Sequence, residues 1–298
     1  MFTLVVSLSN HEQNRSSFDG LRTSGFPNAP EARLYVQPGA QPIHSTVKGV
    51  VLLAYGRTDK GLRPTNEDCF AIQQELGLCV VADGMGGHNA GEVAARLAVE
   101  AVVEFVRSSD ETWPFGYDAA LSVEGNILRT SIHLANVRIL ETSIATNHYA
   151  GMGTTIVAAR VAGGRLTIAH AGDSRLYVMA GRRLRQVTRD DSWMATMLLH
   201  DPLADPWVLQ QHPMRNALTN VVGSRPRFDV HVAEESLAGG ERLLLSTDGV
   251  HGVVDDGRLE QLMGDDDDPQ AIAHNVVATA LTRGSRDNCT AIAARYVA

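Results

Sequence analysis

Four apolar segments of this sequence carry an aspartate at one end. These aspartates are Asp83, Asp173, Asp248 and Asp287. Aspartate is a poor strand residue and is costly to bury without a partner. A single Asp-Gly pair after a strand is most simply a turn. Four aspartates at strand ends far apart in the sequence instead favour one shared site. Carboxylates are ligands of hard divalent cations, so the pattern predicts a Mg²⁺ or Mn²⁺ site.

Short apolar runs bounded by glycines and polar residues recur from about residue 48 onward and are typical of strands. They are 50–55, 77–83, 154–160, 165–173, 175–180, 242–248 and 289–297. Segments 90–107 and 123–143 repeat apolar residues at the helical period, and 269–283 predicts a third helix that ends at Gly284. Helices placed between groups of strands, with hairpins closed by glycine, predict an α+β domain of helix-covered antiparallel sheets.

Residues 1–46 are rich in Ser, Asn, Gly and Pro and show no sustained period. They predict a disordered or loosely attached extension before one domain at 47–298. The 298 residues are 44% hydrophobic, which is enough for a substantial core.

The formal net charge of −8 argues against a broad basic surface and therefore against nucleic acid as a partner. No run approaches the about 18 apolar residues of a membrane span. The three cysteines form no CxxC pair, and the opening MFTLVVSLS is a poor signal peptide. These features predict a cytoplasmic protein.

The glycine-rich loop after Asp83 has two interpretations. Gly84, Gly86 and Gly87 allow a tight turn and leave the carbonyl of Gly84 free to face a metal. A glycine-rich turn before a helix can also hold nucleotide phosphates. However, neither GxxxxGK[ST] nor GxGxxG occurs here and no lysine follows, so the phosphate loop is rejected.

Seven motifs together resemble the metal-dependent type 2C (PPM) serine/threonine protein phosphatases, in their bacterial branch. They are GLRPTNED at 61–68, VADGMGGH at 81–88, GTT at 153–155, AGDSRLY at 171–177, NALT at 216–219, LLSTDGV at 244–250 and RDNCT at 286–290. The resemblance covers about residues 48–298. It implies a four-layer α-β-β-α sandwich, in which helices flank two antiparallel sheets, with two Mn²⁺ or Mg²⁺ ions in a cleft.

The resemblance also implies the metal ligands. Asp83 would bridge both ions, and the carbonyl of Gly84 would bind one of them. Asp248 and Asp287 would bind the other ion. Asp173 would take part in a third, weaker site.

Three residues of the first motif would act beside the metals. Asp68 would hold water at the centre, with Glu67 nearby. Arg63 would bind the substrate phosphate, because its planar fork suits phosphate better than a lysine does. A solvated surface arginine is the alternative.

The implied reaction is hydrolysis of phosphoserine and phosphothreonine in proteins by a metal-activated bridging water. The implied partners are phosphorylated proteins and a bacterial Ser/Thr kinase that the enzyme opposes. Two rivals remain: a catalytically silent binding module, and a phosphatase for an anti-sigma-factor antagonist or for small phosphoesters.

Several positions leave alternatives open. Met85 stands where some relatives have a histidine proposed as general acid, so the proton donor is unidentified. For His88 we favour capping or packing over catalysis, and for His170 a satisfied place in the core. Segment 190–213 is either a flap beside the cleft or a plain surface helix and loop. The acidic run 265–268 is better explained by a solvated loop before a helix than by a metal site.

Overall fold

The computed structural model describes residues 51–87, 90–108 and 113–297. The predicted N-terminal extension at 1–46 and His88 lie outside the described residues.

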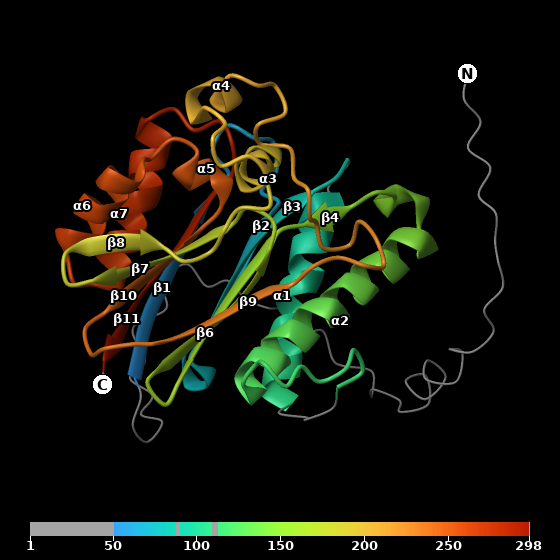
Figure 1. The fold of residues 1–298 in the computed structure, drawn as a ribbon, viewed down its shortest axis with the longest axis horizontal. Coiled ribbons are helices and arrows are strands. Elements are labelled where there is room, and N and C mark those ends of the chain that lie inside the picture. The colour runs from blue at the N-terminus through green and yellow to red at the C-terminus, as the bar shows by residue number, and fades with distance from the viewer. Residues whose placement is uncertain (1–50, 88–89, 109–112, 298) are drawn as a thin grey trace. The chain divides into compact units, whose positions relative to one another are not determined.

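Two antiparallel sheets form the centre of the domain (Figure 1). The first has the strand order β1-β11-β10-β7-β8, and the second has the order β2-β3-β5-β6-β9, with β4 paired to β3. The first sheet comprises β1 (Val51–Asp59), β7 (Arg175–Ala180), β8 (Arg183–Gln186), β10 (Arg242–Ser246) and β11 (Cys289–Val297). The second comprises β2 (Asp68–Gln73), β3 (Leu78–Met85), β4 (Gly153–Thr154), β5 (Ile156–Ala162), β6 (Arg165–Ala171) and β9 (His231–Ser236).

Helices cover the outer face of each sheet. Helices α1 (Ala90–Ser108) and α2 (Val123–Ala145) pack on the second sheet, and α5 (Asp248–His251), α6 (Asp256–Gly264) and α7 (Pro269–Thr282) pack on the first (Figure 1). The connection from β8 to β9 holds the short helices α3 (Trp193–His200) and α4 (Pro206–Gln210). Two 3₁₀ turns, η2 (Gln74–Leu76) and η3 (Asn147–Tyr149), complete the elements. The predicted four-layer α+β sandwich is confirmed.

Strand β3 shows why the central strands are apolar on both faces. Val80 and Ala82 pack under α1 and α2, whereas Cys79 and Val81 pack between the two sheets. A strand buried on both faces reads as an unbroken apolar run. Asp83 continues the alternation of Cys79 and Val81, so its side chain lies on the side that faces the first sheet.

The hairpin glycines and the acidic run lie where the sequence predicts them. Gly163 and Gly164, both at positive φ, join β5 to β6. Asp268 caps α7 by accepting from the amide of Gln270, so the acidic run does precede a helix.

No helix among residues 51–87, 90–108 and 113–297 is long and apolar enough to cross a bilayer.

Candidate metal centre

A cleft of about 620 Å³ gathers most of the predicted site residues. Its walls come from the loop before β2, the end of β3, the β6–β7 turn, the start of α5 and the loop before β11. The predicted residues that line it are Arg63, Glu67, Asp83, Gly84, Asp173, Asp248 and Asp287. The structure therefore brings seven of the eight predicted residues to one cavity.

Asp83 is held at the end of β3 by its backbone. Its amide donates to Thr155 Oγ1 at 3.0 Å, and its carbonyl accepts from the amide of Thr155 and from Thr154 Oγ1. Burial, followed by the charges of the neighbouring aspartates, raises the pKa of its carboxyl well above the usual value. Those neighbours are Asp68, Asp248, Asp173 and Asp287, so the four strand-end aspartates do converge.

Asp68, the eighth predicted residue, is buried beside the cleft, and its Cα pairs with that of Asp83 across β2 and β3. Its Oδ2 accepts from Thr247 at 2.9 Å and from Thr290 at 2.6 Å. Its Oδ1 is buried without a protein partner. Burial raises the pKa of this carboxyl to about 7, against two opposing hydrogen bonds. A buried carboxylate oxygen without a donor fits a cation or water at this point.

Asp248 is the first residue of α5, and its Oδ1 is also buried without a partner. Burial, followed by the charge of Asp287, raises the pKa of its carboxyl. A Cβ on Gly249 would lie 1.9 Å from the carbonyl oxygen of Asn288. Glycine at this position therefore lets the start of α5 touch the loop that carries Asp287.

Arg63 and Asp287 form an ion pair at the mouth of the cleft. Arg63 Nη2 donates to Asp287 Oδ2 at 2.7 Å, and 55% of the arginine side chain is exposed. The hydrogen bond and charge of Asp287 raise the pKa of Arg63. The only described cation that lines the cleft thus has a carboxylate partner at its edge.

Gly84 and Glu67 lie where the loop before β2 meets α1. The amide of Gly84 donates to the carbonyl of Glu67 at 3.1 Å, and a Cβ on Gly84 would lie 2.0 Å from the carbonyl oxygen of Gly91. Close packing under α1 therefore requires glycine here, a reason that the sequence did not disclose. Burial raises the pKa of the Glu67 carboxyl.

Asp173 follows Gly172, which has φ of +100° and would clash with Thr155 if it carried a Cβ. Burial, then the charges of Asp248 and Asp190, raise the pKa of Asp173 to about 7. The next residue, Ser174, shares a 2.7 Å hydrogen bond with Thr155 Oγ1. Thr155 thus links the backbone of Asp83 to the Asp173 loop.

Four residues that bond to the predicted site residues were missed in the sequence. They are Thr155, Thr247, Thr290 and Asn288. The hydroxyls of Thr247 and Thr290 donate to the carboxylate of Asp68, whereas the other two accept from the backbone amides of Asp83 and Glu67. All four lie inside the recognised motifs, which was the available signal.

Two further predictions have mixed outcomes. His170 is buried in β6 as expected, but its Nδ1 has no partner, so the prediction of a satisfied histidine is wrong. Burial lowers its pKa to about 4, which keeps the ring neutral.

Segment 190–213 contributes no residue to the cleft, whereas Asn216 and Leu218 directly after it line the wall. Met85 also lines the cleft.

The chemistry of the carboxylates suits hard divalent cations, but their side chains do not form a preformed metal site. In the part of the chain that the structure describes, no three His, Cys, Asp or Glu side chains meet the geometry of a preformed metal site. Asp287 instead accepts a hydrogen bond from Arg63. Two unpaired carboxylate oxygens and raised carboxyl pKa values mark a surplus of negative charge, which cations would neutralise.

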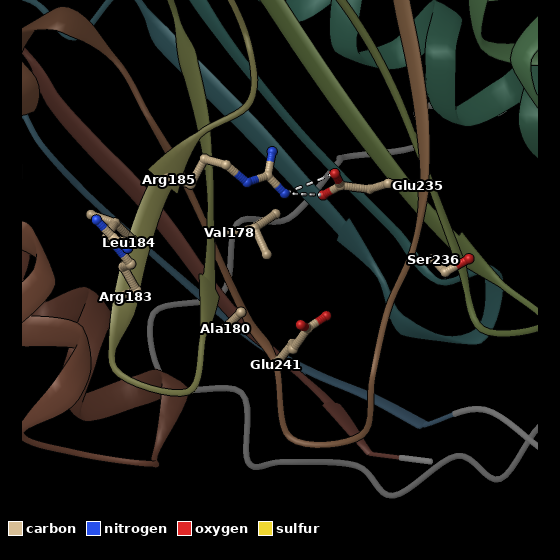
Figure 2. A pocket seen from close by; sticks show the side chains of 8 residues that line it. All are labelled: Val178, Ala180, Arg183, Leu184, Arg185, Glu235, Ser236 and Glu241. Atoms are coloured by element: carbon tan, nitrogen blue, oxygen red, sulfur yellow. Dashed lines mark hydrogen bonds and ion pairs between the residues drawn. The ribbon is translucent and has the colours of Figure 1, made fainter.

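A second groove, of about 430 Å³, lies beside the β7–β8 hairpin (Figure 2). Its lining consists of Val178, Ala180, Arg183, Leu184, Arg185, Glu235, Ser236 and Glu241. Arg185 donates to both oxygens of Glu235, at 3.0 and 2.8 Å (Figure 2). None of the predicted site residues lines this groove, so the carboxylate cleft is the candidate site.

Comparison with known proteins identifies the family of the chain. Residues 60–267 match the family described as Protein phosphatase 2C. The chain is 31% identical over 249 residues to "Serine/threonine protein phosphatase PstP" of Mycobacterium tuberculosis, covering 83% of this chain and 46% of PstP. The chain thus spans about half the length of that relative. It is 30% identical to "Serine/threonine phosphatase stp" of Listeria monocytogenes, covering 79% of this chain and 92% of that protein.

A solved structure of the catalytic domain of PstP, described as a complex with two manganese ions, superposes with a TM-score of 0.69 at 30% identity. The superposition covers 84% of this chain and all of that chain.

Proposed function

The chain belongs to the Protein phosphatase 2C family, and on that basis we propose that it hydrolyses phosphoserine and phosphothreonine esters in proteins with the help of two Mn²⁺ or Mg²⁺ ions. One observation carries the proposal: buried or half-buried aspartates from distant strand ends meet at one cleft that has an arginine at its mouth. The relatives named PstP and stp, and the two manganese ions in the PstP structure, support it.

The proposed ligands follow from the placement of the carboxylates. Asp83 would bridge the ions, the carbonyl of Gly84 would bind one, and Asp248 and Asp287 would bind the other. Asp173 would form the third, weaker site. The unpaired Oδ1 of Asp248, and the charge of Asp248 that helps raise the pKa of Asp83, support a shared role for this pair. When bound, the ions supply a bridging activated water as nucleophile and neutralise charge on the phosphoryl oxygens.

The chain's own side chains would then orient the substrate and water. Asp68 is fixed by two threonine hydroxyls through Oδ2, which leaves Oδ1 to orient water at the centre. Glu67 would assist from the cleft wall. Arg63 would turn from Asp287 to the phosphate and bind two of its oxygens.

Protonation of the leaving serine or threonine oxygen would come from water or from a carboxyl group of the site. Of the described residues that line the cleft, none is a histidine or a lysine. Met85, which lies on the wall, cannot donate a proton.

We also propose that the enzyme acts in signal transduction, opposite a bacterial Ser/Thr kinase. The names of the bacterial relatives support a protein substrate. The cytoplasmic location stays a prediction from the sequence.

Phosphopeptide hydrolysis tests the proposal. Wild-type protein, Asp83→Asn and the control Asp265→Asn should be assayed on phosphoserine, phosphothreonine and phosphotyrosine peptides, with Mn²⁺ and with EDTA. Asp265 is an exposed carboxylate between α6 and α7, so its substitution should leave activity unchanged. We expect turnover of the first two peptides only with Mn²⁺. Asp83→Asn should lose at least about 100-fold, more than the usual effect of removing a residue that only supports a metal ligand, because Asp83 would itself bind both ions.

Two outcomes would replace the proposal. A folded wild-type protein that is inactive with Mn²⁺ on every phosphopeptide and on p-nitrophenyl phosphate would identify a binding module. Turnover of small phosphoesters without turnover of either peptide would identify a small-molecule phosphatase.

A further inference from the structure

Asp191 and Gly172 are joined by two reciprocal hydrogen bonds. The amide of Gly172 donates to Asp191 Oδ2 at 3.0 Å, and the amide of Asp191 donates to the carbonyl of Gly172 at 3.0 Å. Gly172 directly precedes Asp173, and the Asp191 residue is only 8% exposed. A buried carboxylate therefore fixes the backbone on one side of Asp173.

Asp191 also joins the two ends of the segment between β8 and β9. Asn220 Nδ2 donates to Asp191 Oδ2 at 2.8 Å, and the amide of Thr219 donates to the carbonyl of Asp191 at 2.8 Å. Residues 192–218 thus begin and end at Asp191, and this segment carries two residues of the cleft wall, Asn216 and Leu218. Asp191 therefore joins the Asp173 loop to both ends of a cleft-lining segment, through its carboxylate at Gly172 and Asn220 and through its backbone at Thr219.

The second carboxylate oxygen has its own partner on another strand. His231 Nε2 lies 2.9 Å from Asp191 Oδ1, and the ring of His231 lies against that of His170, with centroids 5.0 Å apart. Burial disfavours the charged form of Asp191, but hydrogen bonds from His231, the Gly172 amide and Asn220 outweigh it and lower the pKa of the carboxyl. Asp191 is thus a charged carboxylate with both oxygens in use.

The other side of Asp173 is held separately. Ser174 bonds to Thr155, and Arg175 forms an ion pair with Asp190 at 2.7 Å. These contacts fix the residues after Asp173, whereas the described side-chain bond to the residue before it comes from Asp191. The direction of the Asp173 carboxyl therefore depends on Asp191.

We propose that Asp191 is a positioning residue that holds Asp173 in place for a divalent cation and ties that position to the cleft-lining segment 192–218. The inference rests on the proposed function, because Asp173 is a ligand only if the cleft binds metal. Asp191 itself does not line the cleft. Residues that orient a metal ligand without contacting the metal typically change metal affinity by about 10- to 100-fold when they are removed.

A double-mutant cycle read by Mn²⁺ binding separates this role from a general effect on the fold. Calorimetric titration with MnCl₂ should be carried out on wild type, Asp173→Ala, Asp191→Ala and the double variant. We expect each single variant to weaken the same weak site by about 10-fold or more. The double variant should bind no more weakly than Asp173→Ala alone, because Asp191 acts on this site only through Asp173.

Two further variants guard against a trivial loss of folding. Thr188→Val removes a different buried hydrogen bond in this region, from the Leu176 amide at 3.0 Å, and should leave Mn²⁺ binding unchanged. Asp191→Asn keeps an oxygen that accepts from Gly172, so it should retain Mn²⁺ affinity within about 3-fold, less than the usual effect of a lost supporting contact.

The outcomes are distinct. Wild-type Mn²⁺ affinity in Asp191→Ala overturns the inference, and so does a double variant in which the two losses multiply. Equal loss in Asp191→Asn and Asp191→Ala would also overturn it, because the acceptor oxygen would then be irrelevant. Wild-type protein that binds no Mn²⁺ and has no activity would instead overturn the proposed function.

Discussion

Arg63 is the residue for which two negatively charged partners compete. Its guanidinium is bonded to Asp287 at 2.7 Å, and more than half of the side chain is exposed. An exposed ion pair contributes little to stability, so releasing Asp287 costs little. The planar fork of arginine can then bind two phosphate oxygens. Arg63 is therefore suited to exchange a protein partner for the substrate.

Arg63→Ala should lower kcat/KM for phosphopeptides by about 10- to 150-fold, on the scale of the roughly 1.5 to 3 kcal/mol of a charged hydrogen bond. Mn²⁺ affinity should not fall, because the variant removes a positive charge beside Asp287. Steady-state kinetics and calorimetry measure the two quantities.

The matched control is Arg96→Ala on α1, which removes an exposed arginine paired with Glu100 at 2.9 Å. Its kinetics should equal those of wild type. Unaltered kinetics in Arg63→Ala would remove the phosphate-binding role.

The aspartates could be predicted from the sequence, but most of their partners could not. Each aspartate lies at the end of its own apolar run, which is a local signal. The bond from Thr247 to Asp68 joins residues 179 positions apart, and the bond from Arg63 to Asp287 joins residues 224 apart. Such contacts depend on the register of strands that meet only in the folded sheets.

At the scale of elements, burial on both faces decided which strands were predictable. β3, β5 and β10 are nearly fully buried and read as apolar runs. β2, β8 and β9 were missed because they are only partly buried. Their side chains mix polar and apolar residues, so their pattern resembles that of a loop.

Helix α5 is the element whose position most directly joins two proposed ligands. Gly249→Ala would place a Cβ 1.9 Å from the carbonyl oxygen of Asn288 and push α5 away from the Asp287 loop. We expect a loss of about 1–3 kcal/mol in the free energy of unfolding, the usual cost of overpacking, together with weaker Mn²⁺ binding. Urea denaturation and calorimetry measure these effects.

Gly257→Ala in α6 is the control, because the nearest atom to its Cβ would be a side-chain oxygen of Asp255 at 3.4 Å. That substitution should be nearly neutral. Wild-type stability in Gly249→Ala would show that the α5 contact tolerates a side chain and does not set the distance between Asp248 and Asp287.

The whole molecule carries an excess of negative charge at its cleft. Burial raises the pKa of Asp68 and of Asp173 from the ordinary value of 3.8 to about 7. Between about pH 4 and 7 the folded protein keeps protons that the unfolded chain has released. Stability without divalent cations should therefore fall as the pH rises through this window.

Thermal unfolding in EDTA should give a higher Tm near pH 5.5 than near pH 8. Saturating Mn²⁺ should raise the Tm most at the higher pH, because ligands that bind only the folded state stabilise it. Asp173→Asn should have a flatter dependence of Tm on pH in EDTA. A Tm that rises with pH in EDTA, or that does not respond to Mn²⁺, would contradict this view of the cleft.

The most direct test of the central claim is a crystal structure of the Mn²⁺-soaked protein, with anomalous scattering recorded at the manganese edge. Two anomalous peaks should lie between the carboxylates of Asp83, Asp248 and Asp287, with Asp83 contacting both. Peaks at any other place, or these three side chains turned away from one another, would contradict the account.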